Sequence, residues 1–260
     1  MQIEINQVGI VGAGAMGQGI AQLAAEAGCT VRLLDTRPGA AHDAVQAIVW
    51  QWERLAESGK RSTQAVHACR TRLFAAADLA ELAACDLVVE AIAEQADAKR
   101  ALLAELEGTV APGALLASNT SSLSITALGT ALGQAQRFCG FHFFNPAPRM
   151  KVVEIVPGLR TAPATADALA ALALRMGHTP VRAQDTPGFI VNRAGRAFGT
   201  EALAIVSEGV TDFATVDRIL RDQVGFRLGP FELMDLTGLD VSHPVMESIY
   251  HQFYEEPRFR

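Results

Sequence analysis

The chain has 260 residues, half of them hydrophobic, which is enough apolar material to bury the core of one large or two modest domains. A formal net charge of −6 argues against a nucleic-acid surface, because phosphate binding depends on clustered lysine and arginine. The sequence contains no apolar run long enough to span a membrane, and its first residues lack the basic and apolar regions of a signal peptide. We therefore expect a soluble, cytoplasmic protein without a nucleic-acid or membrane partner.

The cysteines are few and widely spaced. None belongs to a Cys-x-x-Cys pair, so the sequence predicts neither a zinc site nor a disulfide framework. We expect no bound metal and four buried free thiols, at Cys29, Cys69, Cys85 and Cys139.

Up to about Arg182, short β-branched runs alternate with segments rich in Ala, Leu and Glu, a pattern typical of strand–helix–strand units that build a parallel sheet. We predict strands at Val8–Val11, Val31–Asp35, Leu87–Glu90, Leu115–Ser118, Phe138–Phe143 and Val152–Val156. Helices are predicted at Ala15–Ala27, Ala40–Ser58, Ala96–Leu106 and Thr165–Met176. Glycines stand where the C-terminal caps of three of these helices belong, at Gly28, Gly59 and Gly108.

The pattern changes at Asp185, where the turn-rich tetrapeptide Asp-Thr-Pro-Gly begins. Apolar residues then recur three or four positions apart, which predicts a long helix; they are Val191, Ala194, Phe198, Ala202 and Ile205. We therefore place a second, helical domain after the turn.

An apolar strand is followed directly by a glycine-rich turn and then by a helix. The turn has the pattern Gly-x-Gly-x-x-Gly and consists of Gly12, Ala13, Gly14, Ala15, Met16 and Gly17. In this context the glycines allow a tight turn, a close approach of a pyrophosphate to the backbone, and close packing of helix on strand. The alternative is a glycine-rich turn with no ligand.

Asp35 ends the next strand, 23 positions after Gly12. A carboxylate at this place accepts hydrogen bonds from the adenosine ribose and repels a 2′-phosphate. NAD is therefore favoured over NADP, although Thr36 and Arg37, which follow, leave NADP open.

Polar residues follow two of the later strands, and ligands bind beyond the carboxyl ends of strands in open parallel sheets. One group runs from Ser118 through Asn119 and Thr120 to Leu123. The other is His142 in an aromatic run, with Glu154 twelve residues later. A histidine paired with a carboxylate suits proton transfer near neutral pH. From the residues alone, His142 as a core histidine and Glu154 as a solvent-facing residue of an alternating strand stay open.

Several motifs resemble those of the L-3-hydroxyacyl-CoA dehydrogenase family, and the resemblance covers nearly the whole chain. They are the glycine turn from Gly12, Val-Val-Glu-Ala-Ile-Ala-Glu from Val88, Ala-Ser-Asn-Thr-Ser-Ser-Leu from Ala117, His-Phe-Phe-Asn-Pro from His142, Asp-Thr-Pro-Gly-Phe-Ile-Val-Asn-Arg from Asp185, and Leu-Gly-Pro-Phe-Glu-Leu-Met-Asp from Leu228.

The resemblance implies roles for particular residues. It makes His142 the general base and Glu154 its orienting partner. Ser121 and Asn192 position the oxygens of the substrate, and Asn145 supports the catalytic histidine. Two more residues lie with the cofactor and the CoA group: Glu94 near the nicotinamide ribose and Lys99 near the CoA phosphates. The glycine turn with Ala15 and Met16, together with Asp35 and Asn119, completes the set for NAD.

We thus expect an α/β Rossmann-type NAD-binding domain over residues 1–184 and an all-α substrate and dimerisation domain over 185–260, with the active site in the cleft between them. The resemblance implies that family members continue further, so we expect the helical part to be truncated. The predicted reaction is the NAD-dependent oxidation of an L-3-hydroxyacyl-CoA by a homodimer. Two alternatives stay open: a dehydrogenase of a free hydroxy acid or sugar acid, and a non-catalytic NAD-binding dimer.

Overall fold

The computed structural model describes residues 3–253, apart from the side chain of Val241. They form two compact units. The first contains the chain through Thr120 together with Ser124–Asp185, and the second contains Ser121–Leu123 and the chain from Thr186 onward. By its contacts, the short stretch Ser121–Leu123 is part of the second unit, although we expected it in the first domain.

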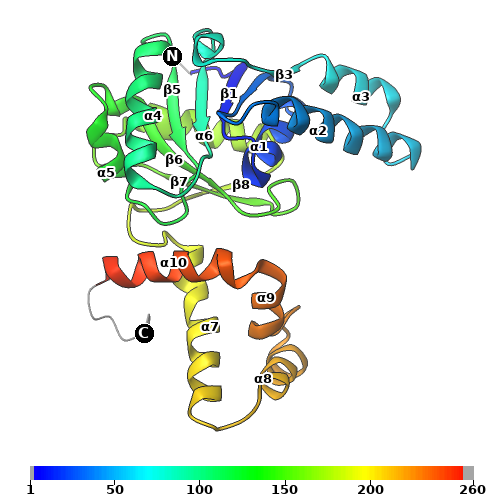
Figure 1. Ribbon diagram of the computed structural model, residues 1–260, viewed down its shortest axis with the longest axis vertical. Coiled ribbons are helices and arrows are strands. Elements are labelled where there is room, and N and C mark those ends of the chain that lie inside the picture. The colour runs from blue at the N-terminus through cyan, green and yellow to red at the C-terminus, as the bar shows by residue number, and fades with distance from the viewer. Residues whose placement is uncertain (1–2, 254–260) are drawn as a thin grey trace. The chain divides into compact units, whose positions relative to one another are not determined.

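The first unit is built on a single eight-stranded sheet (Figure 1). Its strands lie in the order β3-β2-β1-β4-β5-β6-β7-β8. Their bounds are β1 Gln7–Val11, β2 Thr30–Leu34, β3 Leu73–Ala75, β4 Leu87–Glu90, β5 Leu115–Ser118, β6 Phe138–Phe143, β7 Val152–Val156 and β8 Thr179–Arg182. The first six strands have the order of a Rossmann-type fold. The predicted fold class is confirmed.

The last two strands, β7 and β8, run opposite to the other six, whereas we predicted a parallel sheet. β7 pairs antiparallel with β6, and β8 then pairs parallel with β7. The physical reason is the connection, because only residues 144–151 join β6 to β7, whereas a parallel pair needs a crossover of a dozen residues or more. The antiparallel turn sets His142 directly opposite Glu154.

Helices join the strands, and all four that we predicted in this unit are present. The α-helices are α1 Ala15–Glu26, α2 Ala40–Glu57, α3 Thr63–Arg70, α4 Ala96–Thr109, α5 Ile125–Leu128 and α6 Pro163–Arg175, with 3₁₀ turns at Leu79–Leu82, Gly129–Ala131 and Ala135–Arg137. The sequence patterns did not predict α3, α5, β3 or β8. Gly28 and Gly59 follow helix ends with φ of 91° and 69°, as expected, whereas the cap at Gly108 is wrong because α4 continues to Thr109.

The two faces of the sheet differ in chemistry. Strand residues such as Ile10, Val89 and Phe141 point to one face and pack with apolar side chains of α1, α2 and α6 in the main core. Because side chains alternate along a strand, the opposite face carries Glu90, Ser118 and His142. These polar positions are buried. The alternation therefore gathers the polar residues of the strand ends on one face.

The second unit is all-helical, as predicted. Its helices are α7 Val191–Ser207, α8 Phe213–Ile219, a π-helical turn at Leu220–Val224, α9 Pro230–Thr237 and α10 Leu239–Gln252. Asp217 of α8 is buried and accepts hydrogen bonds from the backbone N–H groups of Phe231 and Glu232, so it caps α9 and joins the two helices.

Candidate active site

The glycine-rich turn lies between β1 and α1. Gly12 has a φ of +109°, and a Cβ there would lie 2.4 Å from the carbonyl oxygen of Ala91. A Cβ on Gly17 would lie 1.7 Å from the carbonyl oxygen of Gly12, so helix and turn touch at this point. At Gly14 a Cβ would meet no atom within 4 Å. This glycine is the N-cap of α1 and gives the helix no side-chain cap. An open helix N-terminus behind bare backbone suits a pyrophosphate, so these residues fit a dinucleotide.

Asp35 follows β2 and is bonded to the glycine turn. Its Oδ2 accepts a hydrogen bond from the N–H of Ala13 at 2.8 Å, and its Oδ1 accepts from the Nε of Arg37 at 3.1 Å. The hydrogen bonds from Arg37, aided by the N–H of Ala13 and opposed by burial, lower the pKa of Asp35 to about 2. The carboxylate is therefore ionised at neutral pH. Arg37, which left NADP open as the cofactor, is an exposed cation beside Asp35.

His142 and Glu154 form a buried pair across β6 and β7. Nδ1 of His142 lies 2.7 Å from Oε2 of Glu154, and the two residues are 4% and 0% exposed. A carboxylate accepts only, so this contact assigns the proton to Nδ1 and the ring lone pair to Nε2. Strand alternation alone would allow Glu154 to face solvent, but the side chain is buried. The structure brings together the two residues that the resemblance implied as base and orienter, although their roles stay a prediction.

A second buried polar group lies where β4 and β5 end. The carboxylate of Glu90 accepts hydrogen bonds from Lys99 Nζ at 2.5 Å, Ser118 Oγ at 2.6 Å and the N–H of Ile92 at 2.8 Å. Lys99 Nζ also lies 3.2 Å from Oε2 of Glu94. The expected contact of Lys99 with CoA phosphates does not fit this placement, because the side chain is 1% exposed and is bonded to carboxylates.

The two asparagines that follow β5 and β6 differ in placement. Oδ1 of Asn119 accepts a hydrogen bond from the N–H of Phe143 at 2.9 Å, so Asn119 fastens the end of β5 to β6 beside His142. Asn145 is exposed, and its side chain makes no hydrogen bond to any residue in the range 3–253. The expected support of His142 by Asn145 is therefore not seen.

Ser121 and Asn192 lie together in the helical unit. Nδ2 of Asn192, in the first turn of α7, donates to the carbonyl oxygen of Ser121 at 3.3 Å. Gln252 near the end of α10 donates to the neighbouring carbonyl of Ser122 at 2.8 Å. The bonded residues are far apart in the sequence and lie together in the folded helical unit.

Glu90 is the functional candidate that sequence analysis missed. It ended the predicted strand Leu87–Glu90 and stood inside a quoted motif, but only Glu94 received a role. The signal was present in the pattern, because a carboxylate that ends an all-apolar strand is buried only if it is paired. Its partner Lys99 lies nine residues on, in α4.

All four cysteines are free and buried, as predicted, and burial raises the pKa of the Cys139 thiol to about 12. Among residues 3–253 no cluster of His, Cys, Asp and Glu could hold a metal ion. In the same range, no helix combines the length and the apolar character needed to cross a bilayer.

Comparison with known proteins agrees with this geometry. Residues 7–186 match the family model "3-hydroxyacyl-CoA dehydrogenase, NAD binding domain", and residues 188–260 match "3-hydroxyacyl-CoA dehydrogenase, C-terminal domain". The chain is 42% identical over its full length to a 3-hydroxyadipyl-CoA dehydrogenase of Escherichia coli, but spans only 54% of that relative. It is 40% identical to a probable 3-hydroxybutyryl-CoA dehydrogenase of Bacillus subtilis, with 99% of this chain and 90% of the relative covered.

Among solved structures, a (S)-3-hydroxybutyryl-CoA dehydrogenase from Ralstonia eutropha superposes with a TM-score of 0.94 at 36% identity, covering 99% of this chain and 90% of that one. The strand order, the glycine turn with its acid and both family models agree. The chain therefore belongs to the 3-hydroxyacyl-CoA dehydrogenase family, a family of NAD-dependent oxidoreductases.

Proposed function

We propose that this chain oxidises the 3-hydroxyl group of an L-3-hydroxyacyl-CoA to the 3-oxo group, with His142 as general base and Glu154 as its orienting partner. The observation that carries the proposal is the buried contact of 2.7 Å between Nδ1 of His142 and Oε2 of Glu154. A protein that only binds NAD has no need of an imidazole with its tautomer fixed by a carboxylate at the edge where ligands bind.

In this mechanism Nε2 of His142 takes the proton of the substrate hydroxyl as the C3 hydrogen leaves as hydride. The ring becomes an imidazolium, and the anionic Glu154 stabilises it through the bond at Nδ1. Because both side chains are buried, their interaction is weakly screened by solvent. In the reverse direction the same nitrogen returns the proton.

The first unit carries the groups that would hold the cofactor. Gly14 leaves room at the open N-terminus of α1 for the pyrophosphate, and Asp35 accepts hydrogen bonds from the adenosine ribose. Bound NAD supplies the hydride acceptor.

The substrate class follows from the family and from the names of its members. The relatives from Escherichia coli and Bacillus subtilis are named for 3-hydroxyadipyl-CoA and 3-hydroxybutyryl-CoA, which are both CoA thioesters. We propose that Ser121 and Asn192, joined by a hydrogen bond in the helical unit, position the oxygens of such a thioester.

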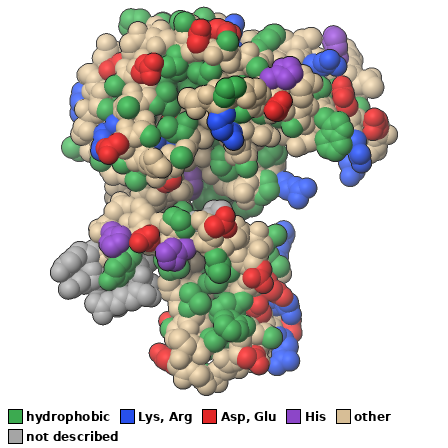
Figure 2. Space-filling view, in the orientation of Figure 1, with side chains coloured by type: hydrophobic (Ala, Val, Ile, Leu, Met, Phe, Trp, Pro, Cys, Tyr) green, Lys and Arg blue, Asp and Glu red, His purple; other side chains and the backbone are tan. Residues whose placement is uncertain are grey.

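We further propose that the helical unit is where two copies of the chain meet. Apolar side chains are visible on the surface of this unit (Figure 2). The most exposed are Val210, Phe213, Val224, Leu236 and Leu239, at 55–73% of their full area. A second copy packed on such side chains would remove apolar surface from water, which favours association. Light scattering of the chain, which should report a dimer, tests this; a monomer with full activity contradicts it.

The reaction is tested by comparing a chain-length series of L-3-hydroxyacyl-CoA thioesters with the corresponding free hydroxy acids, with NADH formation as the readout. We expect turnover of the thioesters and none of the free acids. Equal or faster oxidation of a free acid would make the chain a hydroxy-acid dehydrogenase. Binding of NAD without oxidation of any member of either series would indicate a non-catalytic NAD-binding protein.

A further inference from the structure

The aromatic run around His142 is divided between the two faces of the sheet. Phe141 and Phe143 point into the main core and are 0% and 1% exposed. Phe144 comes two residues after His142, so the alternation of an extended chain puts it on the same face as the imidazole. The ring centroids of Phe144 and His142 are 4.5 Å apart, and their planes are tilted by 60°. Phe144 therefore packs on the imidazole, and the mechanism above gives it no role.

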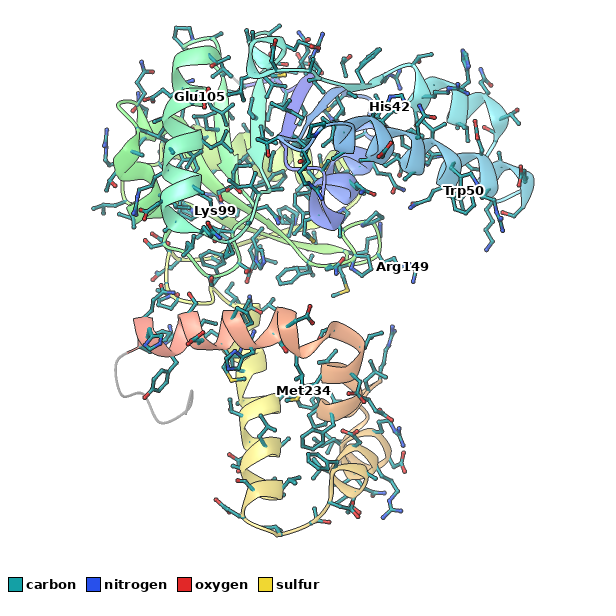
Figure 3. All side chains as sticks on the ribbon, in the orientation of Figure 1. His42, Trp50, Lys99, Glu105, Arg149 and Met234 are labelled. Atoms are coloured by element: carbon teal, nitrogen blue, oxygen red, sulfur yellow. The ribbon has the colours of Figure 1, made fainter. Side chains whose placement is uncertain are left out.

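Exposure to solvent increases from Glu154 through His142 to Phe144. Glu154 is 0% exposed, His142 is 4% exposed, and Phe144 is partly exposed. Phe144 also begins the loop of residues 144–151 that follows β6, and Arg149, labelled in Figure 3, is an exposed residue of this loop. The phenyl ring is therefore part of the apolar cover that keeps water from the imidazole.

Glu154 and Phe144 act in opposite directions on the protonation of His142. The carboxylate at Nδ1, 2.7 Å away and buried, favours the imidazolium. The apolar ring disfavours it, because exclusion of water destabilises the charged form more than the neutral one. A base must be uncharged before it can accept the hydroxyl proton, so the second effect keeps His142 ready for the reaction.

The elements packed against β6 bring few other charges to the imidazole. β5 ends in Ser118 and is followed by Asn119, and both are uncharged. The charged residues of α6 and of the loop after β6 are exposed, where water screens them: Asp167, Arg175, Arg149 and Lys151. On β7 the charged residue is Glu154 itself.

We propose that Phe144 is a positioning residue that excludes water from the imidazole of His142 and so keeps it uncharged beside the anionic Glu154. Oxidation then extends to a lower pH than the pair would allow if water reached the ring. The catalytic consequence rests on the proposed function, in which His142 is the base. The protonation of the ring can be measured without substrate.

The test is an NMR titration of the His142 ring in the free chain, with its signal assigned by its loss in His142→Ala. Phe144→Ala opens the cover to water, so the pH at which the ring takes up a proton should rise by roughly one unit. Phe144→Leu keeps an apolar side chain over the ring and should leave this pH nearly unchanged. The matched control is Phe74→Ala on the edge strand β3, where the side chain is 47% exposed, and it should have no effect.

The variants separate exclusion of water from the other roles of a phenyl ring. If Phe144 only stabilises the fold, Phe144→Ala lowers stability and the pH of protonation stays unchanged, which overturns the proposal. If Phe144→Leu shifts this pH as far as Phe144→Ala, the effect comes from the electrostatics of the aromatic ring, which also overturns it. Should Phe144→Ala fail to fold, Phe144→Val opens part of the cover and is expected to raise the pH of protonation; no rise there counts against the proposal.

Kinetics on the same variants test the catalytic consequence separately. The acidic limb of kcat/KM for thioester oxidation should move in Phe144→Ala by as much as the titration does, because this limb reports the base of the free enzyme. A limb that stays in place while the ring titrates at a higher pH, or a chain that oxidises no thioester, contradicts the proposed function. The titration alone decides whether Phe144 shields His142.

Discussion

Replacement of Asp35 by alanine should change which cofactor the chain prefers. In the folded chain this carboxylate is ionised, and it is bonded to the N–H of Ala13 and to the guanidinium of Arg37. A unit charge close to a doubly charged 2′-phosphate repels it by roughly 2 kcal/mol even at a dielectric near that of water. Loss of the hydrogen bonds from the ribose to a charged acceptor costs NADH a further 1.5 kcal/mol or more. The two effects sum to about 3 kcal/mol or more, or at least roughly a hundredfold in the ratio of Kd for NADPH to Kd for NADH.

The assay is fluorescence titration of both reduced cofactors against the unmodified chain, Asp35→Ala, and Asp35→Ala combined with Arg37→Ala. Arg37 is released when its partner is removed and can then attract the 2′-phosphate, so the double variant should lose part of the NADPH affinity that the single variant gains. A looser glycine turn, which also follows from losing the bond to Ala13, weakens both cofactors alike and leaves the ratio unaffected. Equal affinities in the unmodified chain, or an unchanged ratio in Asp35→Ala, would refute the reasoning.

Three further outcomes are expected. Gly14→Ala should keep the melting temperature of the unmodified chain but weaken NADH binding, because a Cβ there meets no protein atom within 4 Å and lies in open space at the helix start. Gly17→Ala should unfold at a lower temperature, because its Cβ would lie 1.7 Å from a carbonyl oxygen. Equal melting temperatures of the two variants would contradict this. The folded pKa of Asp35, about 2, lies below its ordinary value of 3.8, so its contribution to stability is complete above pH 4 and lost as the pH falls toward 2. Urea unfolding should therefore show Asp35→Asn to be less stable than the unmodified chain near neutral pH. As the pH is lowered, this difference in stability should persist to about pH 4 and disappear near pH 2. Asp185→Ala removes bonds from Ser124 Oγ and two backbone N–H groups at the start of α5, and it should cost about 1–3 kcal/mol in urea unfolding. Asp167→Ala, in an exposed ion pair, should cost under about 0.5 kcal/mol, and equal losses would refute this role of Asp185.

Most of the sheet could be predicted from sequence because its strands are buried on both faces and read as continuous apolar runs. β4, β5, β6 and β7 begin and end where predicted. The elements that were missed have weaker patterns. β3 has three residues, one of them an exposed Phe74, and β8 contains Pro180 at the free edge of the sheet. The direction of β7 could not be read from its composition, since it depends on the short connection, residues 144–151, that joins it to β6.

For the site, sequence patterns located the residues but not their partners. The glycine turn and Asp35 could be assigned because the chemistry lies in a short continuous motif. His142 and Glu154 were found, but whether Glu154 points inward depends on the register between β6 and β7, which the sequence does not encode locally. The role of Lys99 came from the resemblance alone, and its burial against Glu90 could not be predicted, because a lysine on a helix is usually solvated.

The central claim is that His142 is a base and not a core histidine, and the chain offers its own control. His178 is also a buried histidine of the first unit, with Nε2 2.9 Å from the carbonyl oxygen of Ala147 and its ring 5.6 Å from that of Phe143. Turnover, NADH affinity and thermal stability should be measured on the same preparations of His142→Ala and His178→Ala. The account predicts that His142→Ala binds NADH almost normally while its turnover falls by roughly 10²- to 10⁴-fold. His178→Ala should lose stability and keep its turnover per folded molecule. A His142→Ala protein that is less stable yet fully active would contradict the mechanism.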